Sequence, residues 1–529
     1  MIKYSKRFSA IIAVFLITSL MTTMFLSGTT VRASVFGSKY FYIYLEKDNL
    51  KDLKKKYREY YKETYLNESS YECKANAKLD GDLVKYDEEM KTIEDYLSRF
   101  ELNVKYNLNN KDLDNSYYSL FLGAKYDNKD FVDMDIKADN KKALISFPSL
   151  TEKVLGIDNT STYKLSSNYV KAFLEDDKAF EELFGVNRDT YDDMLQGYFK
   201  DTIFDQIPDS KVVFSSDDKF EDIKCNSITF NIDKEVIANI YKAMAAKLED
   251  DKNVRIICNS FINSFIDLAD IEGQYIDFER PTPEEIDEEI KSLCESLYDE
   301  AENLDDIQIE YTAYFKDNGD ILSRQFIEKE SDIGITLSTF KDSLGNDTIS
   351  FDVRESKDSI FEIRNKMKLQ NGLYNGECNL DISGRNLIKA DYTYEKDAKV
   401  GGLSAFVGTI KGKVSLEQSE DDSEYTDLNS DLSDIYFSIN NKRKDNNTLQ
   451  GQYAFTSKID GKRTGITVFT EVKQWNVSNI AKPNISLDNA ISIYDEEGME
   501  EFTNDIGESI QEKIIGVLLS GSPEEEYLD

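Results

Sequence analysis

The chain has 529 residues, of which 40% are apolar and 12% aromatic, and this content of core-forming side chains excludes global disorder and allows several domains. Its formal net charge is -37, and because its first 33 residues carry four bases (Lys3, Lys6, Arg7 and Arg32) and no acid, the rest carries -41. A surface of this sign repels phosphate backbones and anionic lipids, and the absence of histidine removes histidine-based catalytic dyads and triads and histidine-ligated zinc.

The N-terminal residues have the pattern of an export segment. Residues 1–7 are cationic, residues 10–26 form an uncharged apolar run, and Val31 and Ala33 fit a cleavage site before Ser34. The pattern predicts either a cleaved signal peptide or an uncleaved N-terminal anchor over 1–33. Because the bases precede the apolar run, both readings place the rest of the chain outside the cytoplasmic membrane. No cysteine follows the run, which argues against a lipoprotein.

Residues 34–160 are predicted to form an N-terminal region of helices and strands. Residues 45–65 and 88–100 have the composition and spacing of helices. Apolar residues alternate with polar ones over 71–79, 102–108, 118–124 and 132–136, which indicates strands with one buried face. Asp139 and Asn140 are suited to a hairpin turn into 143–147.

Residues 161–305 are predicted to be mainly helical. Amphipathic helices are expected over 168–184 and 188–204, and a strand pair over 211–215 and 223–232. Asp233 is a predicted N-cap for the next helix, and 254–268 is strongly apolar. Thr282, Pro283 and Glu285 form a capping box with proline at the first helical position, so a further helix is expected to begin there.

Residues 306–529 are predicted to form an antiparallel β region that ends in a helix. Clean alternation begins at 307–315, Asn318 and Gly319 predict a hairpin turn, and further strands are expected over 333–337, 349–353, 361–369, 435–439, 453–459 and 466–472. The acidic stretch 417–434 is predicted to be a loop. The last helix carries Met499, Phe502, Ile506, Ile510 and Ile514 on one stripe.

No catalytic, cofactor-binding or metal-ligating residue can be singled out, so the chain is predicted not to be an enzyme and to need no cofactor. It lacks nucleotide-binding loops and the hydrolase nucleophile motif. Asp427, Asp431 and Asp434 lack the spacing and glycine of an EF-hand. A hydrolase that uses paired carboxylates stays open as an alternative, although no pair stands out among 101 acids.

The five cysteines have no paired spacing and are expected to be free and buried, with one disulfide as the alternative. They are Cys73, Cys225, Cys258, Cys294 and Cys378. The abundance of Tyr and Phe has two interpretations, sheet packing or an apolar cavity that holds a lipid-like ligand.

Three segments carry a resemblance: 39–46 (KYFYIYLE), 227–240 (SITFNID, then VIANI) and 482–490, from Lys482-Pro483 to Asn489-Ala490. On these segments the chain resembles a family of extracytoplasmic envelope proteins of low-GC Gram-positive bacteria, which have an N-terminal membrane or signal segment and no assigned catalytic residues. The alternation of broad sheets with apolar helices is also similar to half-barrel lipid carriers of bacterial envelopes. The resemblance implies a non-enzymatic protein of the cell envelope.

The sequence therefore predicts an α+β protein with large, twisted antiparallel sheets, either a meander or a half-barrel, packed against amphipathic helices. The expected function is an extracytoplasmic envelope protein that binds an apolar or lipid-like ligand. The alternative is a surface protein that makes protein–protein contacts through an acidic face; neither reading includes nucleic acid as a partner. Because a one-sided sheet must be covered, Ile309, Tyr311 and Phe315 are expected to face the C-terminal helix or the helix that starts at Thr282.

Overall fold

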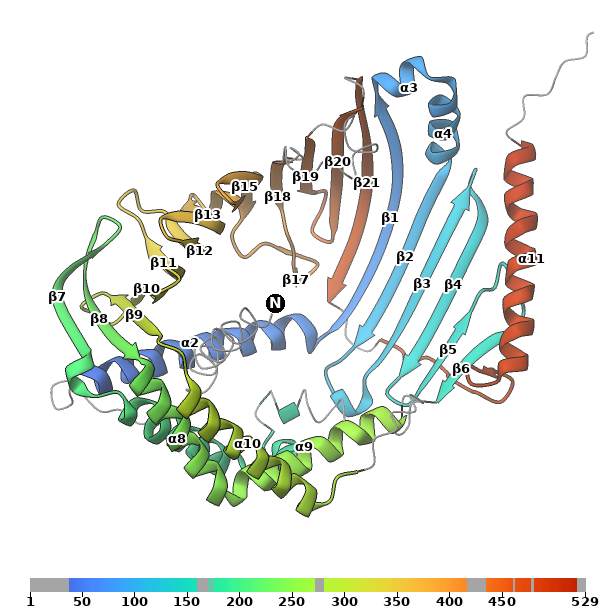
Figure 1. Ribbon diagram of the computed structural model, residues 1–529. Coiled ribbons are helices and arrows are strands. Elements are labelled where there is room, and N and C mark those ends of the chain that lie inside the picture. The colour runs from blue at the N-terminus through green and yellow to red at the C-terminus, as the bar shows by residue number, and fades with distance from the viewer. Residues whose placement is uncertain are drawn as a thin grey trace, which may run out of the picture. The chain divides into compact units, whose positions relative to one another are not determined.

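The computed structural model describes residues 38–158, 171, 172, 174, 176–271, 280–415, 434–459, 462–476 and 480–520. The chain divides into two compact units. Unit 1 comprises residues 1–60, 164–366 and 381–385, and unit 2 comprises 61–163, 367–380 and 386–529, so neither unit is one continuous stretch. Helices and large antiparallel sheets make up both units, which confirms the predicted α+β class (Figure 1).

The sheet of unit 1 is an antiparallel meander in which β7, β8, β9, β10, β11 and β12 pair in that order. Asn318 and Gly319 form the predicted turn between β9 and β10, and Gly319 takes a φ of 92°, which glycine adopts without strain. The strands are β7 (Val212–Phe220), β8 (Ile223–Asp233), β9 (Gln308–Phe315), β10 (Ile321–Glu328), β11 (Ile333–Lys341), β12 (Asp347–Glu355) and β13 (Asp358–Gln370, in this unit to Lys366).

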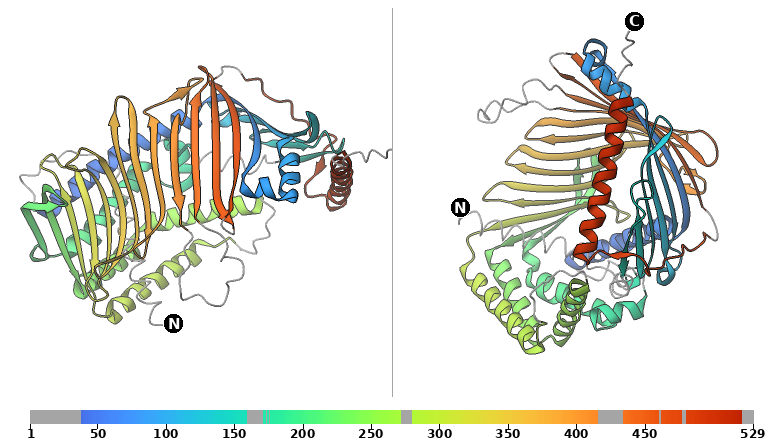
Figure 2. Two further views of the ribbon diagram at one scale, coloured as in Figure 1. Left: turned by 90° about the horizontal axis from the view of Figure 1, so that it is seen from above. Right: turned by 90° about the vertical axis from the view of Figure 1, so that its right-hand side faces the viewer.

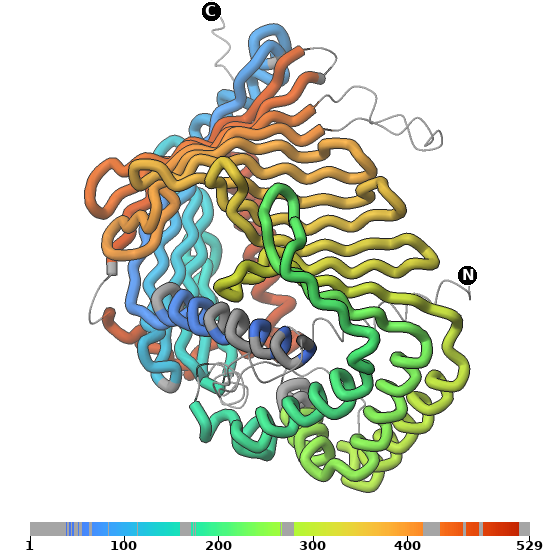
Figure 3. The backbone as a smooth tube through the Cα atoms, turned by 90° about the vertical axis from the view of Figure 1, so that its left-hand side faces the viewer, coloured from blue at the N-terminus to red at the C-terminus, as the bar shows by residue number. Residues whose placement is uncertain are grey.

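The tip of the β7–β8 hairpin folds over one face of the same meander (Figure 3). At this tip the ring centroids of Phe220 and Phe340 lie 5.3 Å apart, and Phe220 also packs with Cys225 and Leu322. Glu221 in the turn lies 3.7 Å from the Arg364 guanidinium of β13. The sheet of unit 1 therefore buries small clusters on one face and its main core on the other.

The helices of unit 1 follow the sequence signals at their N-termini. Asp233 caps α8 by accepting a hydrogen bond from the Val236 amide, and Thr282 and Glu285 form the predicted capping box of α10. These helices are α2 (Ser38–Tyr65, in this unit to Tyr60), α6 (Asp177–Phe184), α7 (Arg188–Tyr198), α8 (Lys234–Asp250), α9 (Lys252–Ile271) and α10 (Pro283–Asn303).

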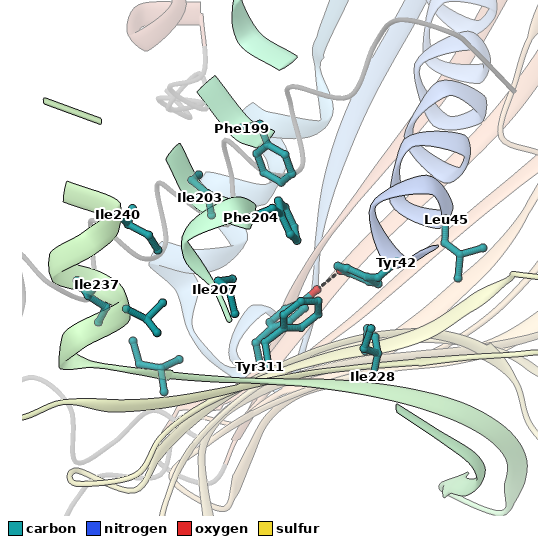
Figure 4. Packing of buried hydrophobic residues seen from close by; sticks show 14 of the residues in the cluster. Tyr42, Leu45, Phe199, Ile203, Phe204, Ile207, Ile228, Ile237, Ile240 and Tyr311 are labelled. Atoms are coloured by element: carbon teal, nitrogen blue, oxygen red, sulfur yellow. Dashed lines mark hydrogen bonds between the residues drawn. The ribbon is translucent and has the colours of Figure 1, made fainter. Parts of the chain in front are cut away.

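The main core of unit 1 lies between β8, β9 and these helices (Figure 4). Ile309, Tyr311 and Phe315 all belong to it and face α8, the end of α10 and the start of α2. Of the two covers predicted, the helix that begins at Thr282 is confirmed through Ala301, with Leu297 packed beside it. The described residues of the C-terminal helix contribute nothing to this core, and α8 and the segment 199–207 provide the rest of the cover together with α2.

Unit 2 contains the longer sheet, whose strands pair in the order β15–β18–β19–β20–β21–β1–β2–β3–β4–β5–β6 (Figure 2). All these pairs are antiparallel, and a short parallel strand, β22 (Ile491–Ser492), joins at β6. The strands are β1 (Glu68–Gly81), β2 (Phe100–Asn109), β3 (Tyr117–Tyr126), β4 (Lys129–Asp139), β5 (Lys142–Ser146), β6 (Val154–Asp158), β14 (Leu373–Ile382), β15 (Arg385–Glu395), β18 (Gly408–Val414), β19 (Ile435–Arg443), β20 (Thr448–Ile459) and β21 (Lys462–Asn476).

Few helices accompany this sheet in the described residues. α3 (Asp82–Tyr86) and α4 (Glu88–Ser98) connect β1 to β2. α11 (Glu496–Ser520) packs at the β5–β6 end of the sheet. There the ring centroids of Phe502 and Phe147 lie 6.0 Å apart, and the Ser509 hydroxyl donates a hydrogen bond to the Leu150 carbonyl. A small hairpin, β16 (Lys399–Val400) and β17 (Leu403–Ser404), completes the unit.

Several predicted elements have different bounds in the structure. The first helix begins at Ser38 rather than at residue 45, so the aromatic segment 39–46 is helical. The helix predicted over 188–204 ends at Tyr198, and a π-helical turn, Phe199–Ile203, follows it. Strands β10, β14, β15 and β18 and the shorter strands β6, β16, β17 and β22 were not predicted. The export segment lies outside the described residues, and no described helix is long and apolar enough to cross a membrane.

Candidate functional site

The aspartates and cysteines that the sequence analysis considered as metal ligands or disulfide partners do not form a site in the described residues. Asp434 pairs with Lys413 at 2.5 Å, whereas Asp427 and Asp431 lie outside the described residues. Within the described part of the chain, no group of three or more Cys, Asp or Glu side chains could hold a metal ion. All five cysteines are free, as predicted, but only Cys225 and Cys294 are buried, whereas Cys73, Cys258 and Cys378 are half-buried.

One face of the unit 2 sheet is apolar across all its long strands, and we call it the apolar face. Because side chains alternate along a strand, the observed registers decide which residues share it. Cys73 lies opposite Val104 and Val472, and Val104 lies opposite Leu122. The face continues outward to Met134, Ile136, Ile145 and Leu155 on β4–β6 and to Leu449, Tyr453, Phe455, Phe437, Ile439 and Ile410 on β18–β20.

The apolar face is only partly covered. Its Leu102 side chain is 53% exposed and its Phe455 side chain 44% exposed. The β16–β17 hairpin covers one part, where Val400 packs on Leu449 and Val472. Gln474 fixes this hairpin by donating a hydrogen bond from its side-chain amide to the Val400 carbonyl at 3.1 Å. Large apolar side chains on β1–β3 and β20 are thus left in contact with solvent, which is unfavourable unless something binds there.

Three tyrosines gather at one end of the apolar face, and we call them the tyrosine cluster. Tyr71 on β1 lies directly opposite Tyr106 on β2, with ring centroids 6.2 Å apart. Tyr118 on β3 lies 6.4 Å from Tyr106. Burial raises the pKa of the Tyr106 hydroxyl, and the neighbouring Tyr118 and Tyr71 hydroxyls raise it further, so Tyr106 stays uncharged at neutral pH.

The opposite face of the same strands is polar. Lys105 pairs with Glu72 at 3.6 Å and Lys125 with Asp130 at 3.6 Å, and these residues line a hollow of about 240 Å³ together with the Phe121 ring. Exposed pairs of this kind contribute little to stability, typically below about 1 kcal/mol. They keep this face solvated, so the two faces of the sheet differ sharply in what they can bind.

Unit 1 contains a cluster with strongly shifted pKa values, at the start of α2. The Arg324 guanidinium contacts both carboxylate oxygens of Glu46, at 2.7 and 2.6 Å. Tyr42 donates a hydrogen bond to Glu46. The Tyr42 and Tyr311 hydroxyls are also hydrogen-bonded to each other (Figure 4). Burial, reinforced by the Glu46 charge, raises the pKa of both tyrosines.

This cluster fits a structural role better than a catalytic one. A bidentate ion pair with Arg324 neutralises the Glu46 charge, and the Tyr42 and Tyr311 rings lie inside the main core of unit 1. The neighbouring Lys39 ammonium is also satisfied, since it donates to the Ile207 carbonyl at 2.9 Å and lies 3.7 Å from Asp209. Together these contacts hold the first turns of α2 in the core of unit 1 and leave no reactive group exposed to a substrate.

The sequence predicts most of the strands that form the apolar face, but it does not predict that these strands lie side by side in one sheet. The alternation over 71–79, 102–108 and 118–124 predicts the apolar positions, but pairing of β1 with β21, almost 400 residues later, cannot be seen from spacing. The tyrosine cluster was missed because Tyr71 and Tyr106 become neighbours only in the observed register. The Glu46–Arg324 pair gave no signal, since its partners are 278 residues apart.

Comparisons with known proteins add no family assignment. No protein-family model and no curated protein matches the chain. Among solved structures, Pseudomonas aeruginosa OccK5 (OpdH) is 6% identical, with 78% of this chain and 100% of that chain covered and a TM-score of 0.15. Pseudomonas aeruginosa OpdQ is 7% identical, with 77% and 97% covered and a TM-score of 0.16. At such TM-scores these likenesses carry no argument, and the resemblance to Gram-positive envelope proteins stays a prediction.

Proposed function

We propose that the protein is a non-enzymatic, extracytoplasmic envelope protein that binds an apolar or lipid-like ligand on the apolar face of unit 2. The observation that carries this proposal is a sheet face that is apolar on every strand from β18 to β6 and still leaves Leu102 and Phe455 about half exposed. Exposed apolar surface of this extent marks a binding site more often than a solvent-facing surface. A half-barrel arrangement of the strands, as in lipid carriers, is part of the same proposal.

The extracytoplasmic location is proposed from residues 1–33. The cationic start, the apolar run and the small residues at 31 and 33 match a signal peptide or an anchor. N-terminal sequencing of the protein recovered from the envelope or the medium is expected to begin at Ser34. Recovery from the cytoplasm with Met1 intact would contradict the proposal.

The ligand proposal is tested by native mass spectrometry of the purified protein, in which co-purified lipid should appear as an added mass that organic extraction removes. A neutral, polarity-sensitive dye such as Nile red should also bind with increased fluorescence. Failure of both would contradict ligand binding by this protein.

Two phenylalanines on neighbouring strands provide a matched pair of variants. Phe455 on β20 belongs to the apolar face, whereas Phe469 on β21 pairs with Asn76 and Gln452 on the opposite, polar face. Their exposures are similar, 44% and 41%. Phe455→Ser should weaken Nile red binding several-fold, while Phe469→Ser should leave it unchanged. Equal effects of the two substitutions would show that the dye does not report on the apolar face.

A second candidate function is protein–protein contact at an acidic sheet edge, which the β7 strand favours. β7 pairs with β8 and with no other described strand, and its Val213 and Phe214 side chains are 55% and 43% exposed. Unpaired edge strands accept an added strand from a partner. Lys39 lies 3.7 Å from Asp209 and Lys224 lies 2.6 Å from Asp217, near the two ends of β7, but both carboxylates are largely exposed, so the edge still favours an extended, cationic partner segment.

This candidate is tested with a basic peptide of alternating apolar residues. Val213→Asp should abolish peptide binding, whereas Leu344→Asp, in the exposed β11–β12 turn, should not affect it. Binding that survives Val213→Asp would rule out the β7 edge as the contact.

A further inference from the structure

The tyrosine cluster gives the proposed ligand site a polar end. Tyr71, Tyr106 and Tyr118 come from three adjacent strands of the apolar face; Tyr71 lies opposite Tyr106, and Tyr118, which pairs with Leu108, is a diagonal neighbour of Tyr106. Their hydroxyls have no hydrogen-bond partner among the described residues, and none of them is a buried unsatisfied group, so they remain open to solvent. A tyrosine hydroxyl can both donate and accept a hydrogen bond, so the cluster can bind a group that does the same.

The surface beside the tyrosine cluster is apolar along the strand direction. From Tyr71 the apolar positions on β1 continue through Cys73, Ala75 and Ala77 to Leu79, with Val104 and Leu102 beside them on β2. At about 3.3 Å per residue, the eight steps from Tyr71 to Leu79 span roughly 26 Å. The hydrocarbon chain of a membrane lipid spans about half of a 30 Å bilayer core, so this run is long enough to hold one.

No charged residue lies on this part of the apolar face. The positions on β1, β2 and β3 that share it are tyrosine, cysteine, alanine, leucine and valine, at 71–79, 102–108 and 118–124. A charged head group placed here would lose water without gaining a counter-charge, which is strongly unfavourable. The net charge of the chain, -37, disfavours an anionic head further.

We propose that the apolar face binds an amphiphile whose head group is uncharged and carries hydroxyl groups, with the head at Tyr71, Tyr106 and Tyr118 and the hydrocarbon chain over Cys73, Val104 and Leu102. This inference rests on the proposed function and names the class of its ligand. Monoacylglycerols and glycolipids belong to that class; fatty acids and acidic phospholipids do not.

The test compares three probes by displacement of Nile red from the full-length protein. They are 1-monopalmitoylglycerol, palmitate and hexadecane, which have similar hydrocarbon chains but a hydroxylated, an anionic and no head group. The parent protein should bind the monoacylglycerol roughly tenfold more tightly than hexadecane, the size of effect expected when one or two hydrogen bonds of about 1 kcal/mol are made, and palmitate should bind more weakly than the monoacylglycerol because its charge has no counter-charge there.

A triple variant, Tyr71→Phe, Tyr106→Phe and Tyr118→Phe, removes the hydroxyls and keeps the rings. It should lose this tenfold preference and bind hexadecane and Nile red as the parent does. The control is Tyr436→Phe, an exposed tyrosine whose register with Thr456 and Lys413 places it on the polar face, and it should change nothing.

The outcomes separate the two proposals. If the triple variant keeps the parent's preference for monopalmitoylglycerol, or if palmitate binds as tightly to the parent, the tyrosine cluster is not a head-group site, while apolar ligand binding stands. If neither Nile red nor hexadecane binds the parent, the proposed function itself fails. An unchanged melting temperature for the triple variant confirms that the loss does not come from unfolding.

Discussion

Strands in both units alternate apolar and polar residues, but the apolar side is covered by helices in unit 1 and largely uncovered in unit 2. In unit 1 the alternating residues of β9 lie under α8 and α10, and Phe315 is 1% exposed. In unit 2 the alternating residues of β1, β2 and β20 have few helices beside them, and Phe455 is 44% exposed. The difference teaches that period-two alternation predicts a one-sided strand but does not say whether its apolar side becomes a core or a binding surface.

The physical reason lies in what each segment between strands contains. Between β8 and β9 the chain inserts three long helices, α8, α9 and α10; α8 and the end of α10 pack on the adjacent strands, and α9 packs beside α8 and α10. Between β1 and β2 it inserts only α3 and α4, which together are too short to cover eleven strands. Unit 1 thus has long helices that bury the apolar residues of β8 and β9, and unit 2 has no helices of this size between β1 and β2.

The largest expected effect separates the two units directly. Phe315→Ala removes a fully buried ring from the main core of unit 1 and should lower the free energy of unfolding by about 3–5 kcal/mol. Phe455→Ala on the apolar face should cost less than about 1.5 kcal/mol, because much of that ring is already in water. Urea unfolding curves of the two variants measure both values. Equal losses would show that the apolar face is as well packed as the core.

The next effect concerns the ion pair that holds α2 in unit 1. Arg324→Met leaves the Glu46 carboxylate buried without its partner and should lower the free energy of unfolding by about 2–4 kcal/mol. This value is lower than for a fully buried pair because Arg324 is partly exposed. Adding Glu46→Leu removes the stranded charge and should recover a large part of this loss. A double variant less stable than Arg324→Met alone would contradict the structural role given to the pair.

A smaller effect is expected from pH. Burial raises the pKa of Tyr42 and Tyr311 in the folded protein, so the folded state holds these protons more tightly than the unfolded chain. The stability that this provides is complete below about pH 10, where unfolded tyrosine begins to ionise, and is lost as the pH rises toward the folded values. The double variant Tyr42→Phe and Tyr311→Phe should therefore lose less stability than the parent between about pH 10 and 12.

The parent is the reference in this experiment, because the other tyrosines ionise in both proteins. Thermal unfolding at each pH, followed by circular dichroism, gives the two curves. Parallel curves for the parent and the double variant would show that these hydroxyls are not buried.

The smallest effect is expected on the C-terminal helix, which belongs to unit 2. Ile514 on α11 is 46% exposed, so Ile514→Asp should change the melting temperature by no more than about 1–2 °C, as is usual for surface substitutions. Phe502→Ala, at the buried contact with Phe147, should lower it clearly more. If Ile514→Asp is the more damaging change, α11 packs through a different face.

Local patterns were read correctly where neighbours in sequence decide the outcome. The capping box at Thr282, the Asn318-Gly319 turn and the alternation around Tyr106 all hold, because each depends on residues within a few positions. The start of α2 was misplaced because Tyr42 and Leu45 combine a strand-like composition with a helical position that packing in the core favours. The extra strand β10 was missed because Arg324 breaks its apolar pattern to reach Glu46.

By itself the sequence determined the fold class, the helix caps at Asp233 and Thr282, the Asn318-Gly319 turn and which side of each predicted strand is apolar, since these follow from local propensity and spacing. Only the tertiary structure decided that β1 lies between β2 and β21, that Tyr71, Tyr106 and Tyr118 meet, and that Glu46 is buried against Arg324. Each of these pairings depends on strand register or on helix docking between distant segments. Register and docking are fixed by how much apolar surface the folded units bury together, a quantity that no short stretch of sequence contains.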